Sequence, residues 1–186
     1  MLLFLQIILV VLVLTIVSSV FFIVIIFLNS LFLWKTRVPF VSSGREACLK
    51  ILDKIKITPE MLVGDMGCGN GQFLFLAAKK YPAKYIGYEL SPVPYFWGLM
   101  KSIIYNQSNV KIKRSDFLQA DVSKMDLVYV YLVGGPLIIK LTNKLKKELR
   151  PGAMVISKGT ALNDWQPIDK IILDEKTGYG AHVYKK

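Results

Sequence analysis

The chain opens with a long segment that is apolar at almost every position. Residues Met1 to Trp34 contain no Asp, Glu, Lys, Arg or His and consist mostly of Leu, Ile, Val and Phe. A helix needs about 20 such residues to cross the roughly 30 Å hydrocarbon core of a bilayer. Residues 1–34 are therefore predicted to form a transmembrane helix. A cleaved signal peptide fits less well, because the segment begins without positive charge and is longer than a signal core.

After this segment, strand-like apolar runs alternate with helical patterns. The segment Glu46 to Ile55 places its apolar residues on one helical face and leads into the first strand. Strand-like runs are expected at 62–65, 85–89, 110–113, 127–132 and 154–157, and helices at 73–80, 95–105 and 137–149. Such alternation indicates βαβ units and a mostly parallel sheet, with right-handed crossovers that cover both faces.

The last part of the chain has a different pattern. Two short strand-like runs, 170–173 and 181–184, are separated by a turn-rich stretch that favours an antiparallel hairpin. The predicted fold class is α/β: an N-terminal transmembrane helix followed by one Rossmann-like domain with a seven-stranded, mostly parallel sheet. The domains are expected at 1–34 and 35–186, since no linker or repeat divides the second part.

The charge of the chain bears on its orientation and partners. The net charge is +11, and all 24 Lys and Arg follow Trp34, beginning with Lys35 and Arg37. This bias predicts a single-pass membrane protein whose domain faces the cytoplasm. A basic domain suits anionic lipid headgroups or nucleic acid. The anchor favours the lipid bilayer as partner, and no nucleic-acid partner is expected, because the basic residues form no dense block.

A glycine-rich turn is the main candidate for chemistry. Asp65, Gly67, Gly69 and Gly71 form an Asp-x-Gly-x-Gly-x-Gly pattern between a predicted strand and a predicted helix. Glycines permit a tight turn and let backbone amides approach a ligand closely. The pattern predicts a small-molecule site at the end of the first strand of the sheet.

A second acidic residue limits which class of ligand the site can bind. Glu89 ends the next predicted strand, 18 residues after Gly71, where a carboxylate can accept hydrogen bonds from ribose hydroxyls. A dinucleotide site has Gly-x-Gly-x-x-Gly and rests a pyrophosphate on a helix N-terminus. Here the third glycine comes one residue early, and the Asp65 carboxylate suits a ligand with a cationic amino group. S-adenosylmethionine is the predicted cofactor.

These motifs resemble those of class I S-adenosylmethionine-dependent methyltransferases. The resemblance implies that the first acidic residue and the glycines hold the methionine part, that Glu89 holds the ribose and that Asp116 lies near the adenine. Cys68 and Leu90, which stand within these motifs, are expected to line the same site. The chain has two cysteines, Cys48 and Cys68, with no Cys/His spacing typical of zinc, so no metal is expected.

A narrower resemblance rests on Pro39 to Ser43, on Gly87 to Pro92 and on Leu149 to Gly152 with Val155, Ser157 and Trp165. These segments are similar to the membrane-anchored lysine methyltransferases of the ATP synthase c-subunit and the adenine nucleotide translocator and to their bacterial relatives. The resemblance implies a lysine acceptor on a membrane-associated protein. A lipid or quinone methyltransferase and a non-catalytic cofactor-binding scaffold are the alternatives.

Methyl transfer from an activated sulfonium requires positioning more than a catalytic triad, so no catalytic residue is assigned. An acceptor lysine must lose its proton, which an apolar or aromatic pocket favours. Tyr129, Tyr131 and Trp165 are the candidates for such a pocket.

Overall fold

The computed structural model describes the chain except for residues 37–42 and 133–134. The chain divides into two compact units, Met1–Pro39 and Phe40–Lys186.

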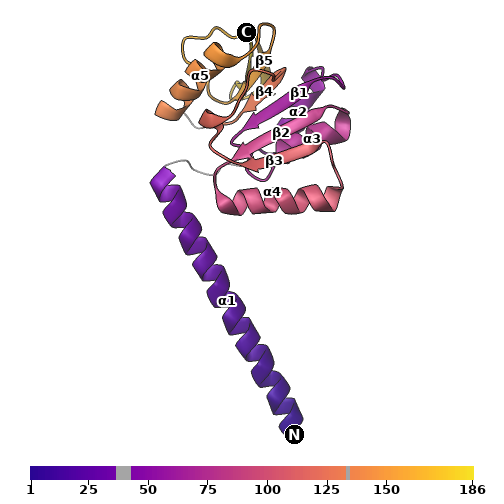
Figure 1. Ribbon diagram of the computed structural model, residues 1–186, viewed down its shortest axis with the longest axis vertical. Coiled ribbons are helices and arrows are strands. Elements are labelled where there is room, and N and C mark those ends of the chain that lie inside the picture. The colour runs from indigo at the N-terminus through magenta and orange to yellow at the C-terminus, as the bar shows by residue number, and fades with distance from the viewer. Residues whose placement is uncertain (37–42, 133–134) are drawn as a thin grey trace. The chain divides into compact units, whose positions relative to one another are not determined.

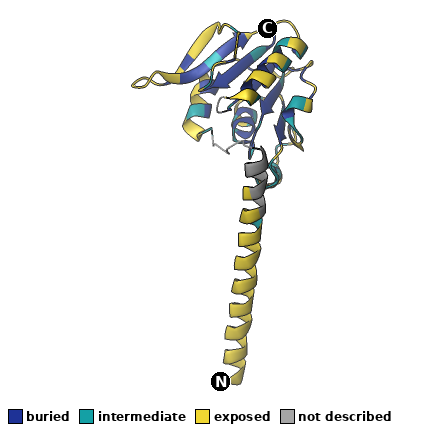
Figure 2. Ribbon diagram, turned by 90° about the vertical axis from the view of Figure 1, so that its left-hand side faces the viewer, coloured by how far each residue is buried: buried dark blue, intermediate teal, exposed yellow. Residues whose placement is uncertain are grey.

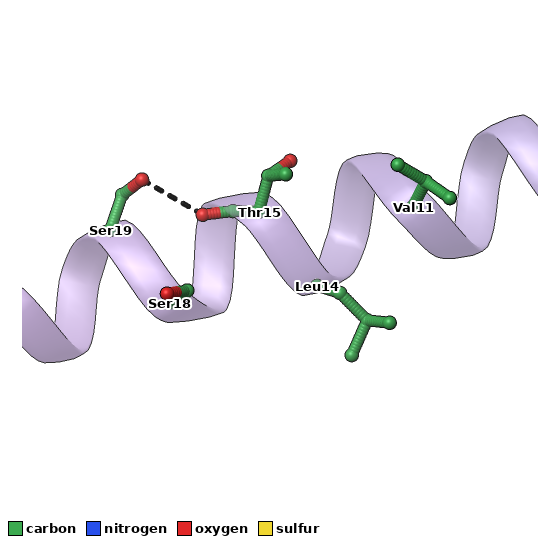
Figure 3. Close-up of a pocket in the computed structure, with 5 residues that line it drawn as sticks. All are labelled: Val11, Leu14, Thr15, Ser18 and Ser19. Atoms are coloured by element: carbon green, nitrogen blue, oxygen red, sulfur yellow. Dashed lines mark hydrogen bonds between the residues drawn. The ribbon is translucent and has the colours of Figure 1, made fainter.

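The first unit contains one long helix, α1 (Leu2–Thr36). Within it, the stretch Leu2–Phe27 is long and apolar enough to cross a membrane, and its side chains are not buried in the protein. Two of its polar side chains bond to the helix itself: the Thr15 hydroxyl donates to the Leu12 carbonyl and the Ser19 hydroxyl to the Thr15 carbonyl, each at 2.8 Å. Figure 3 shows Thr15 and Ser19 on α1, with the hydrogen bond from Ser19 to the Thr15 carbonyl as a dashed line. A helix in hydrocarbon must satisfy its polar groups internally in this way.

The second unit is built on a seven-stranded sheet. Its strands are β1 (Leu62–Met66), β2 (Lys84–Glu89), β3 (Val110–Arg114), β4 (Leu127–Val130), β5 (Met154–Lys158), β6 (Asp169–Asp174) and β7 (Tyr179–Lys185). They lie in the order β3-β2-β1-β4-β5-β7-β6. The first five strands are parallel, and β7 pairs antiparallel with both β5 and β6.

Helices cover both faces of the sheet (Figure 1). One face carries α2 (Arg45–Lys54), α3 (Gln72–Lys80) and α4 (Pro92–Tyr105), and the other carries the short 3-10 helix η1 (Phe117–Gln119) and α5 (Pro136–Glu148). Two apolar clusters form as a result, one centred on Phe73, Leu74 and Tyr85 and the other on Met66, Val128 and Leu141. Figure 2 shows the buried strands between helices whose outer sides are exposed.

The observed fold confirms the predicted Rossmann-like architecture, the seven strands and the antiparallel C-terminal hairpin. The main differences from the expectation concern α4, β4, β7 and η1. α4 begins at Pro92, three residues before its predicted start, and β7 begins at Tyr179, two residues before its predicted start. β4 ends at Val130, two residues before the predicted end of the strand, and η1 was not predicted. The end of β4 was misplaced because Tyr131 and Leu132 continue the apolar run without belonging to the ladder. Three residues of η1 are too few to show helical periodicity.

The packing of α5 predicts a large difference between two similar substitutions. Leu141 is fully buried, whereas Ile139 on the same helix is 43% exposed. Leu141→Ala leaves a cavity and should lower the free energy of unfolding by about 2–5 kcal/mol. Ile139→Ala should change it by less than about 0.5 kcal/mol. Thermal unfolding of the full chain in mild detergent measures both, and equal effects would contradict the assignment of the inward face of α5.

Candidate functional site

The sheet reverses its strand order between β1 and β4, and the predicted site residues gather at that point. From β1 the chain proceeds outward to β2 and β3, then returns to β4 on the other side of β1. In open α/β sheets, ligands bind outside the carboxyl ends of the strands at such a reversal. Asp65 lies near the carboxyl end of β1, paired in register with Gly87 on β2 and with Tyr129 on β4.

The glycine loop between β1 and α3 is held against the end of β2. The backbone N–H groups of Gly67 and Cys68 both donate to the Tyr88 carbonyl, at 3.0 and 3.1 Å. Gly67, Gly69 and Gly71 all have positive φ, at 82°, 56° and 74°. Side chains rarely adopt this conformation, so the three glycines at alternate positions are required by the shape of the loop. Its backbone is thereby preorganised for close approach of a ligand.

The Glu89 carboxylate links this loop to the β2–α4 junction. One of its oxygens accepts a hydrogen bond from Gly69 N at 2.8 Å, and the other accepts one from Ser91 N at 2.7 Å. The side chain is buried, with 8% of its surface exposed. A carboxylate offers about four lone-pair positions, so each oxygen can accept a further hydrogen bond. Glu89 can therefore hold the loop and receive ribose hydroxyls at the same time.

Asp65 is a second buried carboxyl group in the same region, with 3% of its surface exposed. Burial raises the pKa of Asp65 well above its usual range, and the negative charge of Glu89 raises it further. Two acidic side chains in one poorly hydrated region favour a ligand that brings positive charge. An amino group and a sulfonium satisfy that requirement, whereas a pyrophosphate would be repelled.

Three further residues predicted to bind cofactor lie around this edge. Cys68 is buried, and its Sγ lies close to Gly87, where an added Cβ would come within 2.5 Å of it. Burial raises the pKa of the Cys68 thiol well above its usual range. The side chain packs in the apolar cluster that contains Leu74 and Tyr85. Leu90 is exposed beside Glu89. Asp116 begins η1, and its carboxylate accepts a hydrogen bond from Leu118 N at 2.9 Å.

The ends of β2 and β3 are joined here, because Ser115 N donates to the Glu89 carbonyl at 3.2 Å. The structure therefore brings the predicted cofactor residues to one edge of the sheet. Asp116 combines a structural role as a cap with a position beside that edge. Its contact with adenine remains a prediction.

The three candidate acceptor-pocket residues do not form one pocket. Tyr129 is buried, its ring stacks on Phe73 at 3.9 Å between centroids, and its hydroxyl donates to Ser43 Oγ at 3.2 Å. Trp165 packs in the apolar cluster on the other face of the sheet, 5.5 Å from the Tyr184 ring. Tyr131 and Trp165 are both partly exposed, but of the three candidates Tyr131 alone directly follows the end of a parallel strand at the switch point.

A lysine that was not predicted lies over the Tyr131 ring. Lys158, at the end of β5, is 4% exposed, and its Nζ lies 3.8 Å from the Tyr131 ring centroid and 5.9 Å from that of Tyr179. The same ammonium group donates to the Ser43 carbonyl at 2.6 Å. Tyr131 thus already packs against a lysine side chain of the protein itself. The only sequence signal was a charged residue at the end of an apolar strand.

Comparison with known proteins gives consistent results. The ANTKMT methyltransferase domain matches residues 65–169. A protein-lysine N-methyltransferase of Saccharolobus islandicus is 26% identical over 145 residues, which are 75% of this chain and 87% of the relative. The adenine nucleotide translocase lysine N-methyltransferase of Mus musculus is 28% identical over 137 residues, 72% of this chain and 58% of the relative.

Among solved structures, an RNA methyltransferase of Salinibacter ruber in complex with S-adenosyl-L-homocysteine is similar, with a TM-score of 0.67 and 23% identity. The match covers 80% of this chain and 93% of that protein. At this identity the likeness establishes the fold. Among the described residues, no group of three or more His, Cys, Asp or Glu side chains is arranged to hold a metal ion.

The raised pKa of Asp65 predicts how the stability of the ligand-free protein depends on pH. The folded state binds the Asp65 proton more tightly than the unfolded state, so stability falls as pH rises from about 4 through the raised pKa. The slope in that window is at most about 1.4 kcal/mol per pH unit. Asp65→Asn should remove this decline and make the ligand-free protein more stable at neutral pH.

Thermal unfolding between pH 4.5 and 8 measures the effect. Glu175→Gln, at an exposed position on the β6–β7 turn, is the matched control and should leave the pH profile unchanged. A decline that persists in Asp65→Asn would contradict this account of the buried carboxyl group.

Proposed function

Since the chain belongs to the family of the ANTKMT methyltransferase domain, we propose that it methylates lysine side chains of a membrane-associated protein. The protein is an S-adenosylmethionine-dependent methyltransferase with a Rossmann-like domain. The lysine acceptor is supported by the names of the two relatives, one a protein-lysine N-methyltransferase and the other specific to the adenine nucleotide translocase. The membrane location is supported by α1.

The observation that carries the cofactor assignment is the pair of buried carboxyl groups beside a glycine loop. In the proposal, Asp65 and the loop residues Gly67 to Gly71 receive the methionine part, and Glu89 receives the ribose. Leu90 and Asp116 flank the adenine. Burial and the neighbouring Glu89 raise the pKa of Asp65, and an amino group or a sulfonium held beside it would supply a counter-charge to the carboxylate.

Bound S-adenosylmethionine supplies an activated methyl group on a sulfonium. In the transfer, the lone pair of the acceptor amine forms the new N–C bond while the C–S bond breaks and its electron pair stays on sulfur. The protein must hold the amine in line with that bond and keep water away. The amine must be neutral, and burial of the lysine favours its neutral form. No described residue is assigned as a general base. In the proposal, the acceptor lysine loses its proton to solvent water as it enters the pocket, before the methyl group is transferred.

Tyr131 is the remaining candidate for the acceptor pocket. Lys158 already lies over its ring, which demonstrates that this ring can pack against a lysine ammonium group. In the proposal, the substrate lysine approaches the part of the Tyr131 side chain that Lys158 leaves exposed, from the cofactor side. Tyr129 and Trp165 support the fold instead, because the first is enclosed by Phe73 and the second lies on the other face of the sheet.

Tethering explains how the enzyme would select its substrates. A transmembrane anchor at 1–34 confines the domain at 35–186 to the membrane surface, which raises its effective concentration for membrane-bound targets. A lipid or quinone acceptor would benefit from the same anchor and is the second candidate. A non-catalytic scaffold would bind the cofactor without transferring its methyl group.

The orientation of the anchor is the first testable consequence. Lys35 and Arg37 directly follow the apolar segment, so the domain should lie on the cytoplasmic side, where the cofactor is made. In intact cells a C-terminal tag should resist added protease and become sensitive after permeabilisation. A tag that is cleaved in intact cells would reverse the assigned topology, and release of the domain into a soluble fraction would contradict the anchor.

The acceptor class can be tested with labelled cofactor. The full chain, incubated with methyl-labelled S-adenosylmethionine and separated membrane and soluble fractions, should label a membrane polypeptide. Gly69→Arg is the inactive control, because a large side chain at a positive-φ position blocks the loop.

Mass spectrometry should place the label on a lysine, and Lys→Arg at that position in the substrate should abolish it. Label that extracts entirely into organic solvent would establish a lipid or quinone acceptor. Cofactor binding without any transfer would establish the scaffold.

A further inference from the structure

Helix α4 exposes an apolar stripe where a surface helix of a soluble domain is polar. Its outward positions are Val93, Phe96, Trp97, Met100, Ile103 and Ile104, which recur at spacings of three and four residues. The four largest exposures among them are 57% for Phe96, 55% for Trp97, 73% for Ile103 and 69% for Ile104. We call these six residues the α4 stripe. A contiguous apolar surface of this kind marks an interaction site.

The inward side of the same helix accounts for its attachment to the domain. Pro94 and Gly98 are buried, and a Cβ on Gly98 would come within 2.6 Å of Ile112 Cδ1 and 3.5 Å of the Asn70 backbone. Tyr105 meets Phe75 edge to face at 5.5 Å. The helix is therefore held on the sheet and against the glycine loop by its buried Pro94 and Gly98 and by the Tyr105–Phe75 ring contact, although Tyr105 itself is 54% exposed. The four most exposed members of the α4 stripe, Phe96, Trp97, Ile103 and Ile104, belong to neither buried cluster of the domain.

The charges around the α4 stripe have one sign. The segment 92–114 contains four basic residues and no Asp or Glu. Arg114 is exposed on β3, an edge strand that contacts α4, and it shares the face of β3 on which Ile112 meets Gly98 of α4. Lys111 and Lys113 are also exposed on β3, but they alternate with Ile112 and so point to the opposite face of the sheet. Lys101 lies at the margin of the stripe, where its partial burial lowers the pKa of its ammonium group. An apolar, aromatic face bordered by cations matches an anionic lipid interface.

We propose that the α4 stripe is a second membrane contact, which lies in the interfacial region of an anionic bilayer. Phe96 and Trp97 are suited to the headgroup level, where aromatic side chains concentrate, and the apolar face of such a helix sinks about 5–10 Å. The inference rests on the proposed membrane location. It adds a lipid-binding surface within the domain itself.

This contact would set the orientation of the active site. In a βαβ unit the helix runs antiparallel to its strands. If α4 lies in the plane of the membrane, the strands lie parallel to that plane as well. The carboxyl edge of the sheet would then face along the membrane surface, close to the headgroups. The enzyme would accept a lysine that lies close to the membrane surface, and a lysine on a domain far above the bilayer would be out of reach.

Tryptophan fluorescence can test the contact in the full chain. The protein has three tryptophans, Trp34, Trp97 and Trp165. Single-tryptophan variants, with the other two replaced by Phe, are reconstituted in vesicles of phosphatidylcholine and phosphatidylserine. The phosphatidylcholine is brominated near the headgroup end of its acyl chains. Trp97 should lose emission to the brominated lipid and be protected from aqueous acrylamide. Trp165, packed against Tyr184 on the other face, is the matched control and should be unaffected by bromine.

The other outcomes are distinct. Trp97 quenched by acrylamide and not by bromine would overturn the proposal, because the stripe would then face water. Trp97 protected from both would also overturn it and would indicate a protein partner or a second copy. The Trp34 variant reports on the anchor separately, and binding of S-adenosylhomocysteine by each variant reports on the fold and the cofactor site. Failure of the lipid contact is thus separable from failure of the proposed function.

Discussion

The Glu89 carboxylate is the interaction on which the site depends. It is buried at the end of β2 and accepts hydrogen bonds from Gly69 in the first loop and from Ser91 at the start of α4. Hydrogen bonds to a charged acceptor in a poorly hydrated region are stronger than neutral ones. One side chain thereby sets the position of the glycine loop relative to the following helix. The backbone of the glycine loop, the Glu89 carboxylate and the start of α4 are consequently linked by hydrogen bonds.

The same arrangement carries an electrostatic cost. Asp65 and Glu89 are both buried, and Glu89 adds to the effect of burial on the pKa of Asp65. A buried carboxyl group without a counter-charge destabilises the folded state. The site is therefore least favourable when it is empty, and a cationic ligand gains affinity by relieving that cost. Binding sites commonly keep such local strain because the ligand, and not the fold, supplies the compensating charge.

The glycine loop and its two acids could be predicted from the sequence because their constraints are local. Positive φ at three alternate positions requires glycine, and the ends of β1 and β2 are brought together by the parallel pairing that the βαβ pattern predicts. The Lys158–Tyr131 contact could not be predicted, because the position of Lys158 depends on a long-range interaction. Its ammonium group donates a hydrogen bond to the carbonyl of Ser43, which is 115 residues away in the chain. The sequence also could not show that Tyr129 is buried while Tyr131 is partly exposed, because the burial of Tyr129 depends on stacking with Phe73 from α3. In α4 apolar residues lie on both the buried and the exposed side. The sequence therefore predicted a helix here but could not show which of its sides faces outward.

The place of β7 in the sheet has a consequence for the biosynthesis of the protein. β7 is the last of the seven strands in chain order, yet it lies between β5 and β6 and supplies hydrogen bonds to both. While the ribosome is still translating the β6–β7 turn, β5 is an unpaired edge of a parallel sheet, and β6 has no neighbour to pair with. Unpaired apolar edges are the surfaces through which nascent chains aggregate. The sheet can therefore be completed only after β7, the last strand to be synthesised, has emerged from the ribosome.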